Sequence, residues 1–125
     1  MSAGTNTGMS AGTSAAEPEG TGRVVFLIRV PEDRRAAFLR AYEEIRHLVA
    51  DGVPGHLRDQ VCRSADDPEQ WLITSEWDRL EAFRAWEATA EHRDLVRPLR
   101  ECFTEARSLK FTVVAETAGP NRPRD

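Results

Sequence analysis

The spacing of the hydrophobic residues changes several times along the chain, and the order of these changes constrains the fold. Val24–Val30 is a nearly continuous run of β-branched and aromatic residues, which is typical of a strand covered on both faces. Pro31 ends the run, and the two acids after it favour the first turn of a helix. Helical spacing then joins Phe38, Tyr42, Ile45 and Val49. Gly52 is a residue type that commonly ends a helix, so a strand followed by a helix is expected here.

Two more strands are expected next. Residues 57–63 and 71–77 have the composition of strands, and the Ala-Asp-Asp-Pro sequence at 65–68 is typical of a hairpin loop. Because the loop is short, the two strands should pair antiparallel.

The second helical region is expected in two pieces. Asp78 is a plausible N-cap for a helix with three apolar residues on one face, Leu80, Phe83 and Trp86. A second piece keeps five residues in phase, Leu95, Leu99, Cys102, Phe103 and Ala106. Pro98 either kinks this piece or marks its start. Residues 109–114 are predicted as the last strand.

The order β-α-β-β-α-β predicts an α+β fold of the ferredoxin-like type, in which a four-stranded antiparallel sheet carries helices on one face. The other face of such a sheet is left uncovered. A second copy of the chain is the simplest cover for an apolar face, so we expect a homodimer.

The predicted folded domain covers residues 23–116 of the 125-residue chain. Residues 1–22 have no aromatic or branched apolar side chain and cannot bury enough surface to offset the entropy of ordering. We therefore predict a disordered tail there and a second one at 117–125. The length suits one domain with a small core.

Charge and composition argue against several classes of protein. The net charge of −4 and the pI near 5.4 do not fit a nucleic-acid-binding protein. The longest uninterrupted apolar run, Val24–Ile28, is far too short to span a membrane, and the N-terminus lacks the features of a signal peptide. We expect a cytoplasmic protein with no membrane partner.

The cysteines and acids do not suggest a metal site. Cys62 and Cys102 fit neither a disulfide framework nor a zinc motif, and reduced, buried thiols are expected. The acidic residues have the spacing of solvated faces and turns rather than of metal ligands.

Several short motifs together resemble a known family. They are Val53-Pro54-Gly55, Arg63-Ser64-Ala65-Asp66-Asp67-Pro68, Ser75–Phe83, Glu91-His92-Arg93 and Arg97-Pro98-Leu99. In this order, on this pattern of strands and helices, they resemble the antibiotic-biosynthesis monooxygenase family over residues 24–114.

The resemblance implies a dimeric α+β barrel. In the quinone-forming branch of the family it implies oxidation of an aromatic polyketide by O2 without metal or flavin, although the family hosts other activities. By resemblance, Trp77 lines a pocket between sheet and helices, and Arg97 corresponds to an arginine of the site. A family tyrosine corresponds to Phe83 and a family asparagine to Ile73, and both asparagines of this chain lie in the predicted tails. Another group must replace that amide, or the reaction differs.

The third strand and the first helix offer candidate substrate-binding residues. Alternation puts Trp71, Ile73, Ser75 and Trp77 on one face of the strand. Trp77 either fills the core, as expected for Trp71, or forms a flat wall for an aromatic ligand, a contact worth about 0.5–1.5 kcal/mol beyond burial. Ser75 is a candidate hydroxyl donor in the same pocket. Tyr42 either packs in the core with its hydroxyl at the rim or contributes to the site.

His92 and Arg97 are the candidate catalytic groups. His92 either caps a helix at the surface or takes a phenol proton as a general base, with haem ligation as a third option. Arg97 is either a solvated arginine or a group that stabilises a phenolate or peroxide anion. The second strand is expected to carry dimer-side or edge residues on one face, His56, Arg58, Gln60 and Cys62. Gln60 is a candidate replacement for the missing asparagine.

The leading hypothesis is a cofactor-independent monooxygenase that oxidises an aromatic polyketide intermediate with O2 in antibiotic or pigment biosynthesis. The alternatives are a non-oxygenase polyketide cyclase or aromatase helper, and a dimeric ligand-binding protein without turnover.

Overall fold

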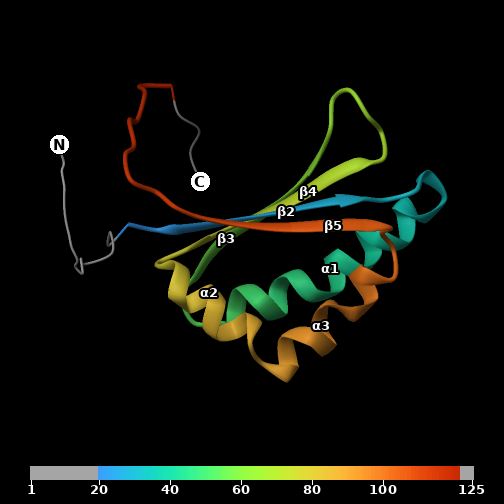
Figure 1. Cartoon of the computed structure of the whole chain (residues 1–125), viewed down its shortest axis with the longest axis horizontal. Helices are drawn as coiled ribbons and strands as arrows, with labels where there is room; N and C mark the ends of the chain where they lie inside the picture. Colours follow the sequence, from blue (N-terminus) through green and yellow to red (C-terminus); the bar gives the residue numbers. More distant parts are fainter. Residues whose placement is uncertain (1–19, 122–125) are drawn as a thin grey trace.

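The structure of the chain is a computed structural model that describes residues 20–121 (Figure 1). The elements in chain order are β2 (Gly22–Arg29), the 3-10 turn η1 (Glu32–Arg34), α1 (Arg35–Gly52), β3 (His56–Arg63), β4 (Gln70–Trp77), α2 (Leu80–Glu87), α3 (Ala90–Arg100) and β5 (Glu105–Thr112). The predicted order β-α-β-β-α-β, with its second helical region in two pieces, is confirmed.

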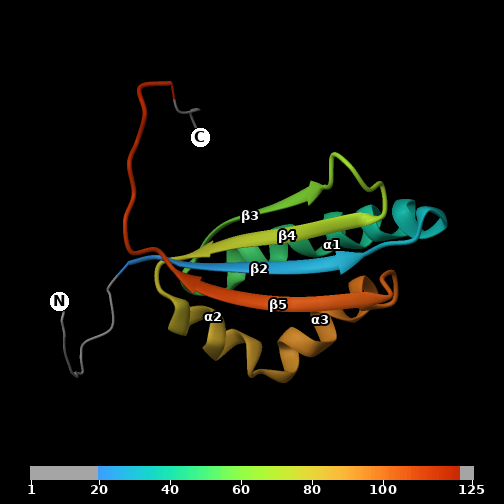
Figure 2. The same ribbon diagram turned by 45° about the horizontal axis from the view of Figure 1, so that its top comes forward.

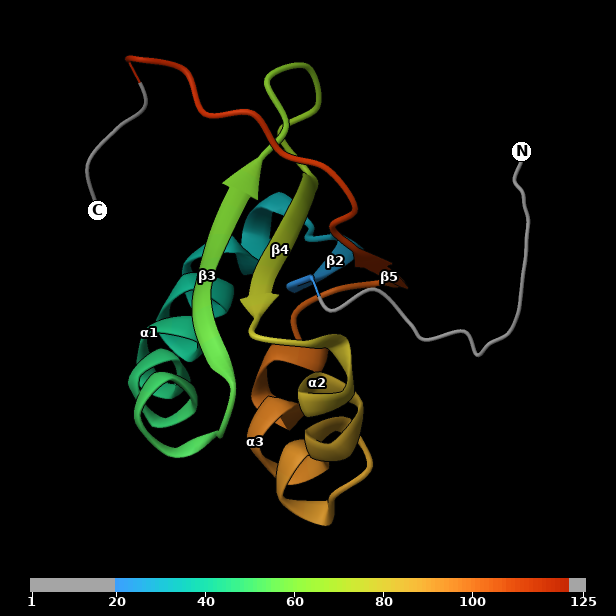
Figure 3. The same cartoon turned by 90° about the vertical axis from the view of Figure 1, so that its left-hand side faces the viewer.

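The four strands form one antiparallel sheet in the order β3-β4-β2-β5. All helices lie on the same side of this sheet (Figures 1 and 2). Viewed from the end, α1 lies under β3 and β4, and the α2–α3 pair lies beside it, toward β2 and β5 (Figure 3). The predicted ferredoxin-like α+β fold is confirmed.

The opposite side of the sheet, here called the open face, carries no helix in the described chain (Figure 2). Strand alternation and register put five apolar side chains on it, Val25, Leu27, Leu72, Leu109 and Phe111. Phe111 is 51% exposed. The central strand β2 is therefore apolar on both faces, but in the described chain only one of them is covered.

The covered face packs two separate groups of buried side chains. The larger one brings β2, β4 and α1 together with α3 and includes Ile28, Phe38, Ile45, Trp71 and Leu99. The smaller one consists of Val24, Trp77 and Phe83, with Trp86 packed against it. A small domain with a divided core has room for a cavity between the two groups.

A turn with a left-handed residue leads into β3. Gly55 has φ +88°, and a Cβ there would lie 2.6 Å from the Ala82 side chain, so both conformation and space favour glycine. The Asp78 amide donates to the Gly55 carbonyl at 2.8 Å and ties the start of β3 to the end of β4. The β3–β4 register then shifts between His56 and Arg58 in a β-bulge.

Two predicted helix boundaries were wrong. The residue at the N-cap of α2 is Arg79 rather than Asp78, and no side chain caps this helix. Helix α3 ends at Arg100, whereas the periodicity had suggested that it continued to Ala106. Ala106 instead lies in β5, which begins at Glu105, four residues before the predicted start. Pro98 lies inside α3 and neither begins the helix nor divides it.

The remaining sequence expectations have mixed outcomes. Cys102 is buried as expected, but Cys62 is exposed, and both are free thiols. Most of the predicted tail at 1–22 lies outside the described residues, as do residues 122–125, and residues 113–121 contain no helix or strand. Within residues 20–121, no helix is long and apolar enough to cross a bilayer.

Candidate functional site

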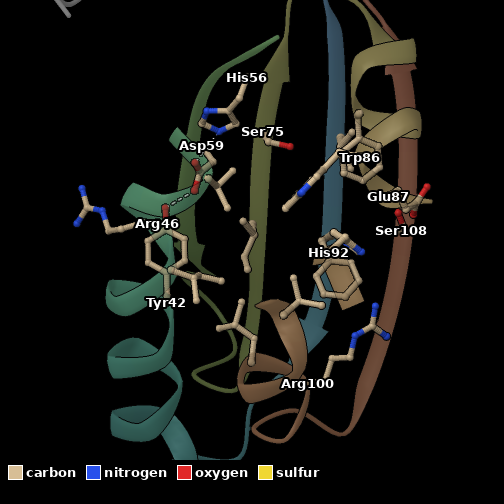
Figure 4. A pocket seen from close by; sticks show the side chains of 18 of the residues that line it. Tyr42, Arg46, His56, Asp59, Ser75, Trp86, Glu87, His92, Arg100 and Ser108 are labelled. Carbon is tan, nitrogen blue, oxygen red and sulfur yellow. Dashed lines mark hydrogen bonds and ion pairs between the residues drawn. The ribbon is translucent and has the colours of Figure 1, made fainter. Parts of the chain in front are cut away.

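A cavity of about 380 Å³ lies between the sheet and the helices (Figure 4). Its size and mostly apolar lining are typical of a small-molecule site. The sheet supplies the floor, with Val24, Phe26, Ile73, Ser75 and Trp77 among the lining residues. One wall comes from α1 and β3, and the other from α2, α3 and the edge of β5. Residues of both core groups line it, so the cavity occupies the space that divides the core.

Four rings form a continuous row along the cavity. His56 packs edge-on against Trp77 with centroids 5.2 Å apart, and Trp77 packs against Trp86 at 5.9 Å. Trp86 in turn contacts His92 at 4.5 Å. The indole N–H of Trp77 donates to Ser75 Oγ at 2.8 Å, which fixes the orientation of the ring. This aromatic row has an imidazole at each end and flat apolar rings between them.

The His92 end of the row is formed by α3. Thr89 caps this helix by accepting the His92 amide at 3.1 Å, so the cap holds His92 in the first turn. Burial, followed by the nearby Arg100 guanidinium, lowers the pKa of His92 below its ordinary value. Its Nδ1 is buried and has no partner within residues 20–121. His92 is therefore a neutral imidazole at neutral pH, beside a cation that lines the same cavity.

The opposite end is a chain of polar side chains from α1 and β3 (Figure 4). The Tyr42 hydroxyl donates to one oxygen of Asp59, and the other oxygen lies 2.8 Å from His56 Nε2. The side chains of His56 and Asp59 are only 3% and 14% exposed. Burial, followed by the hydrogen bond to Asp59, raises the pKa of Tyr42 well above its ordinary range. Tyr42 is therefore a protonated donor at neutral pH.

Six of the seven predicted site residues line the cavity, namely Tyr42, Ile73, Ser75, Trp77, Phe83 and His92. Trp77 was expected either to fill the core or to line the pocket, and it does both: it is 1% exposed and it lines the cavity.

Arg97 is the exception. Its side chain is 65% exposed and its guanidinium lies 3.1 Å from Asp94, outside the cavity lining. Residues four apart share a helix face, so the face of His92 continues through Val96 to Arg100, and Arg97 is turned away from it. Two other arginines, Arg46 of α1 and Arg100 of α3, line the cavity.

Sequence reasoning did not propose His56, Asp59, Trp86 or Arg100 as site residues, and all four line the cavity. His56 was expected at the dimer side or the sheet edge. It lies on the edge strand β3, but its side chain lines the cavity, because the bulge after it inserts a residue that alternation does not count. Helical periodicity could have found Arg100 from His92 and had already put Trp86 in phase with Phe83. Gln60, the proposed replacement for the family amide, is exposed and does not line the cavity.

No cluster of three or more potential metal ligands occurs in the described part of the chain. The polar groups of the cavity are instead suited to exchanging protons with a ligand and to holding a negative charge on it.

Comparison with proteins of known sequence finds relatives in Streptomyces. The chain is 45% identical over 106 residues to a 42.8 kDa protein in the whiE locus of Streptomyces coelicolor, covering 82% of this chain and 26% of that protein. It is 42% identical to the polyketide synthase CurD of Streptomyces cyaneus over 78% of this chain and 26% of CurD. The chain thus spans about a quarter of the length of these curated relatives.

Solved structures share the fold. A putative antibiotic biosynthesis monooxygenase from Bordetella bronchiseptica superposes with a TM-score of 0.68 at 19% identity, covering 77% of this chain and 99% of that one. SnoaB, a cofactor-independent oxygenase from Streptomyces nogalater, gives a TM-score of 0.66 at 22% identity, covering 82% and 99%. The family model for antibiotic biosynthesis monooxygenases matches residues 21–98. The chain belongs to the antibiotic biosynthesis monooxygenase family.

Proposed function

We propose that the chain is a cofactor-independent monooxygenase that oxidises an electron-rich aromatic polyketide with O2. The observation that carries this proposal is the aromatic row, which joins two indole rings to a neutral imidazole beside a guanidinium. A flat polyphenol would stack along the tryptophans with one oxygen substituent at the His92 and Arg100 end. The names of the relatives, which include a polyketide synthase, support this substrate class.

The proposed reaction proceeds through the anion of the ligand. His92 accepts a phenol proton, because its lowered pKa leaves it neutral and its position allows contact with the ligand. Arg100 stabilises the negative charge that develops on oxygen. The anion then transfers electrons to O2 and a carbon–oxygen bond forms. Loss of water leaves a quinone, so one oxygen atom enters the product and the other leaves as water.

A matched pair of arginine variants tests this proposal. Arg100→Gln should lower kcat/KM for oxygen uptake with 1,8-dihydroxyanthrone by about 10²–10³, the usual effect of losing one group that stabilises a developing anion. Arg97→Gln should leave it unchanged, since that side chain is exposed and paired with Asp94. Equal losses in both variants, or none in either, would contradict the role of Arg100.

Ile73→Asn separates oxygenase from non-oxygenase functions. Ile73 lies on the cavity floor, and by the resemblance it corresponds to the family asparagine. The variant therefore returns an amide to the site, although a polar group in an apolar wall lowers stability somewhat. Under the oxygenase proposal, oxygen uptake should be kept or increased. If neither wild type nor the variant consumes oxygen while wild type still binds anthrones, the oxygenase proposal fails.

A second candidate function is a polyketide cyclase helper, or a binding protein without turnover. Ile73 and Phe83 favour it, because both line the cavity and, by the resemblance, correspond to an asparagine and a tyrosine of the quinone-forming branch. Such a protein would guide a poly-β-keto chain by the shape of the cavity. Analysis of the products from a linear polyketide in the absence of O2 would distinguish it.

We also propose that two copies associate through the open face as a homodimer. The five apolar side chains of that face support this proposal, since a small domain gains stability by covering them.

A further inference from the structure

The hydrogen-bonded chain Tyr42–Asp59–His56 has no part in the proton transfer assigned to His92. It links three side chains from α1 and β3 at the far end of the aromatic row (Figure 4). A largely buried carboxylate that accepts a hydrogen bond from an imidazole fixes its tautomer and stabilises the cation formed when it takes a proton. Tyr42 donates to the same carboxylate and so holds it in place.

Only one nitrogen of His56 remains available for chemistry. Nε2 is engaged by Asp59 at 2.8 Å, and Nδ1 has no hydrogen-bond partner within residues 20–121. The ring lines the cavity and contacts Trp77 edge-on, with an interplanar angle of 80°. A ligand that stacks along Trp77 would therefore have one edge beside His56.

The two ends of the row differ in the charged group that lies beside the imidazole. At the His92 end, Arg100 disfavours a positive imidazole, and Glu87, which acts in the opposite sense, is a weaker influence. At the His56 end, Asp59 compensates the positive charge of a protonated imidazole. Arg100 can therefore stabilise negative charge on a ligand at the His92 end, and Asp59 can stabilise positive charge on His56 at the other end.

We infer that His56 is the base that removes a proton from a carbon of the ligand, and that Asp59 and Tyr42 are positioning residues for it. In this step the carbon–hydrogen bond breaks and a bond forms between that hydrogen and Nδ1. The electron pair passes through the ring to the carbonyl oxygen at the Arg100 end. The ligand class is an anthrone-like ketone whose acidic carbon lies across the ring from its carbonyl. The inference rests on the proposed function, because it requires the same ligand in the same cavity.

Hydrogen exchange without oxygen tests this inference directly. Wild-type protein under argon should accelerate the exchange of the methylene hydrogens of 1,8-dihydroxyanthrone with D2O, followed by mass spectrometry. His56→Ala and Asp59→Asn should each lower the protein-dependent rate by about 10²-fold, which is within the range for loss of a general base. Added imidazole should restore exchange in His56→Ala, which a merely structural role would not allow. His47→Gln, which removes an exposed histidine of α1, is the matched control and should exchange like wild type.

Tyr42→Phe keeps the ring and removes only the hydroxyl, so it remains informative if the other variants fold poorly. It should lower exchange less than Asp59→Asn does. Unchanged exchange in folded His56→Ala and Asp59→Asn, or a loss confined to His92→Gln, would overturn the inference. If exchange depends on His56 but the protein takes up no oxygen in air, the assignment of His56 as the base is supported and the proposed oxygenase function is overturned. No exchange in wild type would overturn the assignment of His56.

Discussion

The Asp59 carboxylate interacts with both Tyr42 and His56, and in addition to burial it raises the pKa of the Tyr42 hydroxyl. The carboxylate accepts from Tyr42 and contacts His56, so ionising the phenol would place two negative charges next to each other. The chain contains a single tyrosine, which makes the effect measurable without interference. Residue-scale properties of this cavity can therefore be followed one group at a time.

Alkaline titration should show that Tyr42 ionises only as the protein unfolds. Because its pKa is raised in the folded state, the folded protein keeps a proton that the unfolded chain releases above about pH 10. Stability should therefore fall as the pH rises past that value, and tyrosinate absorbance should appear together with the loss of the circular dichroism signal. Asp59→Asn should let the folded protein ionise at lower pH than wild type. Tyrosinate in folded wild type near pH 10 would contradict the interpretation.

Replacing the two strand tryptophans should separate packing from ligand binding. Trp71 and Trp77 are 6% and 1% exposed, so Trp71→Ala and Trp77→Ala should each reduce the free energy of unfolding by about 3–5 kcal/mol. Only Trp77 lines the cavity, so only its variant should weaken anthrone binding at temperatures where both remain folded. Urea unfolding and fluorescence titration check the two effects. Equal losses of affinity would mean that the cavity depends on general packing.

At the scale of elements, hydrophobic spacing predicted the helices and strands well, and the errors lie where spacing carries no information. Periodicity cannot distinguish the end of α3 from the start of β5, because Ala106 fits both patterns. The bulge in β3 leaves no mark in the sequence pattern, yet it is the reason that His56 and Asp59 reach the cavity together. The resemblance pointed to Trp77, which lines the cavity, but it also pointed to Arg97, which does not; Arg100 was missed, although helix spacing from His92 could have found it.

The cap of α3 should connect helix stability with the site. Thr89→Ala removes the acceptor of the His92 amide and should reduce the free energy of unfolding by about 1 kcal/mol. It should also weaken ligand binding, because the freed first turn no longer fixes His92 beside Trp86. Thr104→Ala, at an exposed threonine between α3 and β5, is the control and should change neither property. A stability loss with unchanged binding would show that the imidazole does not depend on the cap.

At the scale of the whole molecule, the two faces of the single sheet differ, because helices cover only one of them (Figure 3). The covered face holds the cavity, and the open face holds apolar side chains that the described chain does not cover. The fold could be predicted because strand and helix order leaves few topologies. Association could be expected from the uncovered face and from the family resemblance.

Charge on the open face should dissociate the proposed homodimer. Phe111→Glu puts a carboxylate on an apolar patch where the partner would bury it, so sedimentation equilibrium at micromolar concentration should change from dimer to monomer. Val114→Glu is the control, because Val114 is 81% exposed and lies beyond β5. A monomeric wild type, or a dimer that persists in Phe111→Glu, would contradict association through this face.

Because the two ends of the aromatic row differ, the two orientations of a ligand in the cavity are not equivalent. An asymmetric polyketide that carries negative charge along one edge gains from Arg100 when inserted one way round and meets the Asp59 carboxylate when reversed. A difference of about 1.4 kcal/mol between the two orientations would favour one of them tenfold. Selectivity for one regioisomer would then be decided as the ligand enters, before any bond to oxygen is made.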